Sequence, residues 1–155
     1  MSASQHVSFL KNMDSTLQAK GNSVYQDTTT NLSANIGYLV TFSGGVPAVN
    51  TSTTVPASGL VLDARTRTPL SGGTTYYDNS IGIVGALPGP CRAILNANSA
   101  VCNFGDPLMQ AADGTVTKEV TGSARVFIGI CTDKNGANPG DLFEVSFCTP
   151  SVRSY

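Results

Sequence analysis

Tryptophan is absent from this sequence, histidine occurs once, and charged residues are scarce. Asp, Glu, Lys and Arg together make up 12% of the 155 residues, compared with roughly 25% in an average soluble domain. The net charge is -1 and no run of Lys or Arg occurs, so the counterion release that drives binding to nucleic acids has no evident source. We therefore expect no nucleic-acid partner.

Long apolar runs are missing as well. No stretch approaches the roughly 20 apolar residues of a membrane-spanning helix, and the first 15 residues lack the charged and then apolar pattern of a secretory signal. These absences predict a soluble protein made in the cytoplasm, with no membrane partner. Because 41% of the residues are hydrophobic and gather in short runs, a folded core is expected.

Residues suited to catalysis or metal binding are few. A Ser or Cys nucleophile normally needs a positioned base, and the single histidine, His6, falls in a segment with helical periodicity. We interpret it as an ordinary helix-surface residue. The four cysteines form no CxxC pair, which disfavours a metal site, and they are interpreted as free thiols. They are Cys91, Cys102, Cys131 and Cys148.

The acidic residues are scattered along the chain, and several adjoin Gly, Asn or Pro. Turn formation is the interpretation for Asp106, Asp113, Asp133 and Asp141. A glycosidase with paired carboxylates stays open in principle, because its two acids need only meet in space. The sequence nevertheless favours a protein that is not an enzyme, with no catalytic residue, no metal ligand and no cofactor.

The first 35 residues are predicted to stand apart from a β-rich domain that covers residues 36–155. Residues 6–20 have the periodicity of a short amphipathic helix, whose apolar side packs either on the domain or on a neighbour. That apolar side is formed by Val7, Leu10, Met13 and Leu17. Residues 22–35 are polar and rich in threonine, and they predict an extended arm that becomes ordered against a partner.

From residue 36 onward, short apolar runs alternate with turn residues, which predicts an all-β fold, either a small β-barrel or a sandwich. Strands are expected at residues 36–42, 59–64, 81–87, 91–96, 125–131 and 142–148. A hairpin is expected from residues 107–110 and 115–119, and residues 133–141 are expected to form a long hairpin connection. Two polar stretches, 44–57 and 65–79, are expected to be exposed loops that could contact partners.

Four features of residues 93–147 occur in a recognisable order. Gly105-Asp106 precedes a short strand, Asp113-Gly114 forms a turn, residues 128–131 are a strand containing glycine, and residues 140–145 are a strand that opens with Gly-Asp. This order resembles the small decoration, or cement, proteins of tailed-phage capsids. The resemblance implies a homo-oligomer, a trimer or dimer, on the outer surface of the virion. There it would bind the major capsid protein and clamp neighbouring capsomers, and no catalytic residue would be inherited.

Candidate partner-binding residues come from the helix, the arm and the second polar stretch. They are Val7, Leu10, Met13, Leu17, Tyr25, Leu32, Tyr76 and Tyr77. The alternative hypothesis is a host-receptor or carbohydrate-binding module of a phage fibre or spike. Such modules stack aromatic rings on sugars, so the absence of tryptophan argues against one, whereas Tyr76 and Tyr77 keep the hypothesis open.

Overall fold

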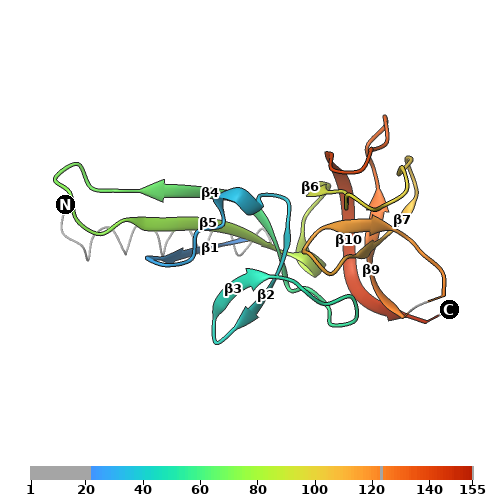
Figure 1. Cartoon of the computed structure of the whole chain (residues 1–155), viewed down its shortest axis with the longest axis horizontal. Helices are drawn as coiled ribbons and strands as arrows, with labels where there is room; N and C mark the ends of the chain where they lie inside the picture. The colour runs from blue at the N-terminus through green and yellow to red at the C-terminus, as the bar shows by residue number, and fades with distance from the viewer. Residues whose placement is uncertain (1–21, 123, 155) are drawn as a thin grey trace.

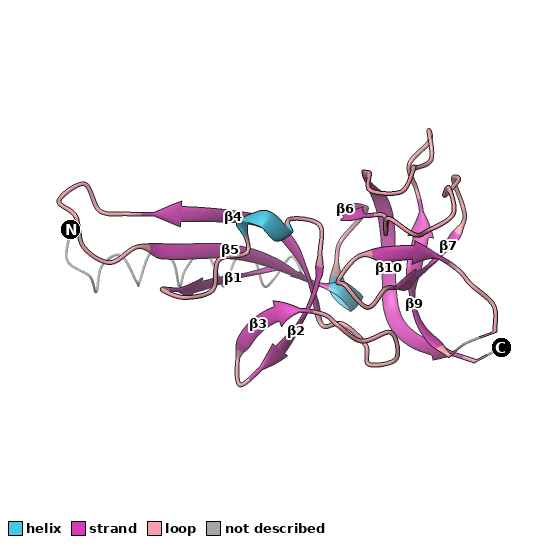
Figure 2. Cartoon of the chain, in the orientation of Figure 1, coloured by secondary structure: helices cyan, strands magenta, loops and turns pink. Residues whose placement is uncertain are grey.

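The structure, a computed structural model of the chain, describes residues 22–122 and 124–154. It confirms the predicted all-β fold. Figures 1 and 2 show an elongated molecule made of strands, in which the described helical segments are two short 3-10 turns, η1 (Ser33–Asn35) and η2 (Val84–Ala86). Neither described turn is long and apolar enough to cross a membrane. The predicted N-terminal helix lies outside the described residues.

The first sheet has five antiparallel strands in the order β1-β5-β4-β2-β3. Its strands are β1 (Asn22–Asp27), β2 (Leu39–Ser43), β3 (Val46–Val49), β4 (Gly59–Arg67) and β5 (Tyr76–Ile83). β4 and β5 pair along their whole length, whereas β2 pairs with β4 only at Leu60 and Gly59. The outer half of β4 therefore extends past β2, and β1, β5 and β4 project from the rest of the molecule as a three-stranded blade (Figure 1).

The second sheet has the order β6-β10-β9-β7-β8. Its strands are β6 (Cys91–Ile94), β7 (Pro107–Gln110), β8 (Val116–Lys118), β9 (Arg125–Cys131) and β10 (Leu142–Arg153). The sheet curls until its two edges meet at a single bridge between Leu95 and Val116. The amide of Asn96 donates to the carbonyl of Val116 at 2.7 Å. We call this unit the half-barrel.

The main core fills the half-barrel and continues into the base of the first sheet. Phe143, Leu108 and Ile128 belong to it, together with Leu39 and Leu60 of the first sheet. Because one cluster of buried side chains includes residues of both sheets, the base of the blade is packed against the half-barrel.

A backbone contact strengthens this junction. The amide of Leu39 donates to the carbonyl of Gly114 at 2.6 Å. Gly114 has a φ of +81°, and a Cβ built on it would lie 3.1 Å from the Leu39 carbonyl. The Asp113-Gly114 turn therefore requires glycine for its backbone conformation, and the close approach of β2 leaves little room for a side chain.

Several sequence predictions are confirmed within the half-barrel. β9 has the predicted bounds, β7 and β8 form the predicted hairpin, and residues 133–141 connect the antiparallel neighbours β9 and β10. The side chains of four acidic residues also accept hydrogen bonds from nearby backbone amides, as expected of turn formers: Asp106 from Asn103, Asp113 from Thr115, Asp133 from Asn135 and Asp141 from Asn138.

Three predictions differ from the structure. Residues 22–27 are extended as expected, but they pair with β5 of their own chain instead of forming an arm that needs a partner. Residues 44–57 contain β3, and Gln110 fastens the segment that follows, because its side-chain amide donates to the carbonyls of Ser52 and Val55 at 2.7 and 2.6 Å. Residues 65–79 begin and end in the paired strands β4 and β5, whereas 68–75 form the exposed turn between them, as predicted. Where these segments form strands, long-range pairing orders residues whose composition is typical of loops.

Candidate docking surface

The outermost part of the blade is the turn of residues 68–75 that connects β4 to β5. We call it the tip. Leu70 has a relative exposure of 108%, so its side chain makes no packing contact with the described part of the chain. Gly72 and Gly73 follow it with positive φ values of 78° and 119°, which glycine adopts without steric cost. The tip lies at the end of the blade away from the half-barrel (Figure 1), and the exposed side chain of Leu70 is therefore displayed far from the core.

The base of the tip is held by polar contacts. The hydroxyls of Thr68 and Thr75 lie 3.0 Å apart. Just inside them, Nε of Arg67 donates to Asp78 at 3.0 Å, and the Arg67 guanidinium lies 5.4 Å from the ring centroid of Tyr76. These contacts restrict the turn from which Leu70 projects, so that less conformational entropy is lost when a partner binds it.

The inner half of the blade depends on a buried amide. The side chain of Asn79 is fully buried. Its Nδ2 donates to the carbonyl of Thr30 at 2.8 Å, and its Oδ1 accepts from the amide of Leu32 at 3.3 Å. Asn79 thus holds the segment after β1 against β5, and a small apolar cluster of Leu32, Val40, Val61 and Ile81 lies beside it.

The end of β1 is fixed by Asp27. Its carboxylate accepts hydrogen bonds from the hydroxyl of Thr29 at 2.6 Å, from the hydroxyl of Thr30 at 2.8 Å and from the amide of Thr28 at 2.6 Å. These donors stabilise the ionised form and lower the pKa of Asp27 to about 2, with the Thr29 hydroxyl as the largest cause. The hydrogen bonds of the Asp27 carboxylate are therefore all made within the turn after β1.

The tyrosines predicted to bind partners lie on the blade. Tyr76 and Tyr77 are consecutive residues of β5, opposite Arg67 and Thr66 of β4. Because successive side chains of a strand point to opposite faces of its sheet, the two rings cannot form one stacking surface. Both are half-buried.

The other predicted residues divide into two groups. Tyr25 packs against the small apolar cluster of the blade, and Leu32 belongs to that cluster with an exposure of 5%. A partner could therefore reach Leu32 only by displacing the segment that follows β1. Val7, Leu10, Met13 and Leu17, like His6, lie outside the described residues.

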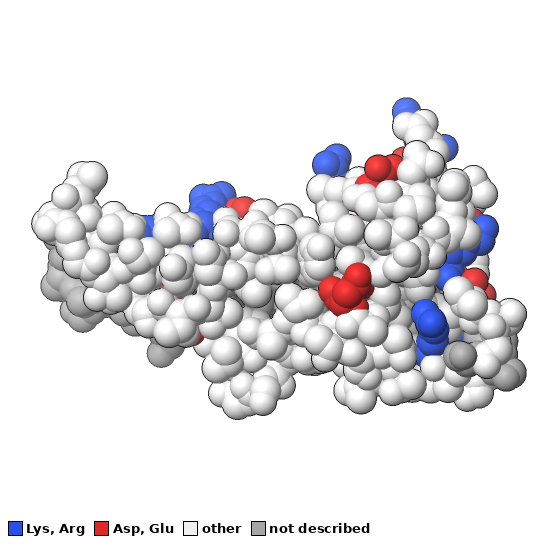
Figure 3. Space-filling view, viewed as in Figure 1, with Lys and Arg blue, Asp and Glu red and all other residues white. Residues whose placement is uncertain are grey.

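Charge is sparse over the face shown in Figure 3, and the blade is mostly uncharged there. The charged residues of the blade include two pairs with short contacts. Arg65 lies 2.9 Å from Asp63, and Arg67 lies 3.0 Å from Asp78. A surface of this kind suits a neutral, polar partner better than a strongly charged one.

The half-barrel contains the most strongly perturbed thiol among the described residues. Burial raises the pKa of Cys102 to about 12, and the neighbouring Cys131 adds to the shift. Burial also raises the pKa of Cys91 and Cys148. Since a thiolate is the reactive form of cysteine, these three side chains are poor nucleophiles. All four cysteines are free.

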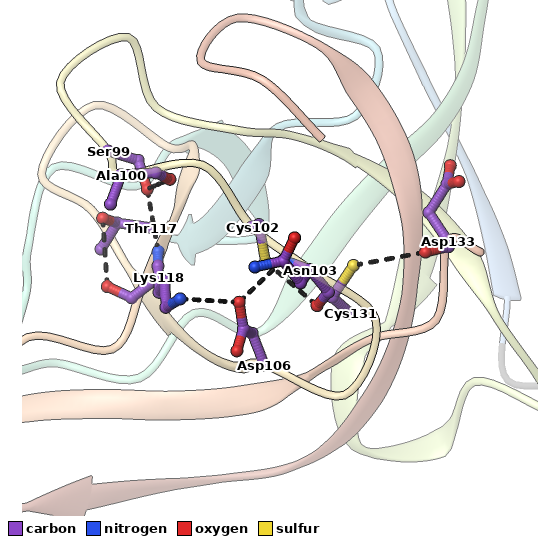
Figure 4. Close-up of polar contacts among 9 residues, drawn as sticks. All are labelled: Ser99, Ala100, Cys102, Asn103, Asp106, Thr117, Lys118, Cys131 and Asp133. Carbon is purple, nitrogen blue, oxygen red and sulfur yellow. Dashed lines mark hydrogen bonds and ion pairs between the residues drawn. The ribbon is translucent and has the colours of Figure 1, made fainter. Parts of the chain in front are cut away.

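Figure 4 shows the polar contacts beside Cys102 and Cys131. Nζ of Lys118 lies 2.8 Å from Asp106, whose carboxylate also accepts from the amide of Asn103 at 2.7 Å. The hydrogen bond from Lys118 is the main reason that the pKa of Asp106 is lowered. The pair ties the turn before β7 to β8, which is a structural role. Within residues 22–122 and 124–154, no group of three or more His, Cys, Asp or Glu side chains could hold a metal ion.

Comparison with known proteins identifies no relative. No family model matches the chain, and neither a curated protein nor a solved structure matches it.

Leu70 lies in the stretch 65–79 that was predicted to be exposed, but the sequence did not single it out as a partner-binding residue. It lies between proline and serine in a polar stretch, and nothing in that local pattern distinguishes it from a loop residue that folds back onto the core. Its exposure follows from the length of β4 and β5, which a threonine-rich sequence does not reveal. The available local signal for a tight turn was the Gly-Gly pair at residues 72 and 73.

Proposed function

We propose that this protein is a non-catalytic structural protein that docks through its blade onto many equivalent sites of a larger assembly. The specific assembly we propose is the outer surface of a tailed-phage capsid, where the protein would act as a cement protein bound to the major capsid protein. The observation that supports docking is the projecting, largely uncharged blade with a fully exposed leucine at a restrained tip.

The energetics of such a role match this surface. Burying one leucine side chain in a partner contributes about 1.5–3 kcal/mol, which is weak for a single site. A shell presents many copies of the same site, and oligomers that engage several of them at once gain from a raised effective concentration. Weak and repeated apolar contacts are therefore sufficient for a cement protein.

A host-receptor or carbohydrate-binding module remains the second candidate, because Tyr76 and Tyr77 lie on the blade. Sugar recognition by stacking favours aromatic rings that share one surface. The opposite orientation of these two tyrosines argues for docking through the tip instead. Glycan binding that is lost in a Tyr76→Ala, Tyr77→Ala variant would support this second candidate.

The test is co-sedimentation and electron microscopy of the purified protein with candidate phage shells that lack decoration. We expect saturable binding to one of these shells. Leu70→Ser should weaken the affinity about tenfold or more, because it removes the buried apolar group. Leu142→Ser is the matched control, since Leu142 is a 44% exposed leucine of the half-barrel, and it should bind as the native protein does. Failure to bind any shell, or equal binding of the Leu70→Ser variant, would contradict the proposal.

A further inference from the structure

The edges of the two sheets differ in how they are protected. An unpaired strand edge presents backbone amides and carbonyls that can pair with another strand, and proteins usually block such edges. The half-barrel joins its edge strands at the bridge between Leu95 and Val116. The first sheet leaves three stretches without a described neighbour: β3, the outer half of β4, and β1.

The edge at β3 is blocked by proline. The amide of Asn50 donates to the carbonyl of Leu39 at 2.9 Å, so alternation along the strand directs Ala48 and Val46 toward β2 and Pro47 outward. Proline has no amide hydrogen to offer a new neighbour. The edge of β3, which is only four residues long, therefore resists strand addition.

The outer half of β4 is blocked by charge. The amide of Ala64 points away from β5, because it donates to Oδ1 of Asp63 at 2.9 Å. The side chain of Arg65 is 79% exposed at the same edge. An occupied amide and charged side chains are common means of preventing edge pairing.

The edge at β1 has neither an outward-facing proline nor an exposed basic side chain. The described strand contains no proline, lysine or arginine, and its single charged residue is Asp27, whose carboxylate binds the turn that follows.

The direction of the β1 backbone groups follows from β4. The amide of Ala64 points outward, so its opposite residue on β5, Asn79, directs its backbone toward β1 and pairs with Tyr25. Alternation along β1 then places the amides and carbonyls of Asn22, Val24 and Gln26 on the unprotected side.

We infer that β1 pairs with β1 of a second copy of this chain and joins two molecules into a closed dimer. Only outward-facing residues can exchange hydrogen bonds, so the antiparallel register is centred on Val24. Val24 of one copy lies opposite Val24 of the other, and Asn22 lies opposite Gln26. Two bonds in each of these pairs give about six backbone hydrogen bonds.

Two further observations favour a second copy as the occupant. In this register the Asp27 residues of the two copies lie at opposite ends of the ladder, so like charges do not meet. A head-to-tail chain of molecules would need a second accepting edge, and the edges of the first sheet at β3 and at the outer half of β4 are blocked. Pairing of β1 with itself is therefore symmetric and closed.

The experiment is analytical ultracentrifugation of the full chain with a proline variant. The native protein should sediment at twice its mass of 16.0 kDa. Val24→Pro should be monomeric, with an affinity at least about a hundredfold weaker, because it removes the central outward amide. The same amide is not used by β5, so the circular dichroism spectrum of the variant should match that of the native protein. Val24→Thr keeps the amide and should remain a dimer.

A second measurement uses only the native chain, so that it remains informative even if the Val24→Pro variant misfolds. Amide hydrogen exchange at Asn22, Val24 and Gln26 should slow as the protein concentration of the native chain rises, whereas exchange at Tyr25 should change little. A monomer at every concentration, a dimeric Val24→Pro variant, or protection of these amides that is independent of concentration would each overturn the inference. A dimer that binds no shell leaves the inference standing and contradicts only the proposed function.

Discussion

The half-barrel and the blade are both antiparallel β-structure, but they are stabilised in different ways. The half-barrel joins its edges and encloses most of the main core, including Phe143, Leu108 and Ile128. The blade has a small apolar cluster near its base and depends on Asn79 and on the turn at Asp27 for its order. The half-barrel therefore provides most of the stability of the fold, while the blade is an extension that can present backbone and side-chain groups to a partner.

The two regions also differ in how many large apolar side chains they bury, and therefore in stability. Each fully buried large apolar side chain contributes about 1.5–3 kcal/mol. The half-barrel contains most of such side chains, whereas the cluster of the blade has four buried residues. Regions with little apolar burial open locally at a lower free energy than the global unfolding of the protein. We therefore expect the outer blade to exchange its amide hydrogens faster than β9 and β10 do.

The largest expected effect comes from removing the biggest buried side chain of the half-barrel. Phe143→Ala should lower the free energy of unfolding by about 3–5 kcal/mol, because it leaves a cavity in the shared core. Leu142→Ala, one residue earlier on the exposed face of β10, should cost about 1 kcal/mol or less. Chemical denaturation measures both values. Equal losses in the two variants would show that the half-barrel does not hold the fold.

A smaller and local effect is expected in the blade. Asn79→Ala leaves the carbonyl of Thr30 and the amide of Leu32 without their partner, at a cost of about 2 kcal/mol. Amides of β1 and of residues 28–32 should then exchange roughly thirtyfold faster, while those of β9 should keep their native rates. Ser80→Ala is the control on the other face of β5. If the amides of β9 accelerate equally, the two regions unfold as one unit and the comparison fails.

How much of the fold the sequence predicts also differs between the regions. β9 and the β7–β8 hairpin were predictable, because apolar runs and the Asp113-Gly114 turn are local signals. β1 and β3 were not, since their residues are polar or carry a proline, and their pairing is with strands that local composition does not indicate. β1, for example, pairs with β5, 50 to 60 positions later in the sequence.

The candidate surface was predicted only in part, because the sequence does not reveal which strands pair. Tyr25, Tyr76 and Tyr77 were chosen as aromatic residues in polar segments, and the structure places all three on the blade. That they belong to strands, with Tyr76 and Tyr77 on opposite faces, depends on a pairing that composition does not reveal. Leu32 was chosen as a residue of the predicted arm, but it is buried because Asn79 holds its segment against β5.

The smallest expected effects concern the pKa values of one carboxylate in each region, Asp27 in the blade and Asp106 in the half-barrel. The pKa of Asp27 is lowered mainly by hydrogen bonds from threonine hydroxyls, and that of Asp106 mainly by Lys118. For both, the folded-state pKa lies below the unfolded value, so the stabilisation is present above about pH 4 and is lost as the pH falls through the folded-state value. For Asp27 that loss should begin near pH 4 and be nearly complete near pH 2.

Ionic strength should separate the two carboxylates, because salt screens ion pairs at the surface far more than it weakens hydrogen bonds from neutral groups. Raising the salt concentration to about 1 M, where the Debye length is about 3 Å, should move the pKa of Asp106 back toward its ordinary value and leave that of Asp27 nearly unchanged. Carboxyl carbon shifts in an NMR titration measure both. Asp27→Asn should abolish the transition near pH 2 at the amide of Thr28. A pKa of Asp27 that moves with salt as much as that of Asp106 would mean that charge, and not the threonine turn, orders the end of β1.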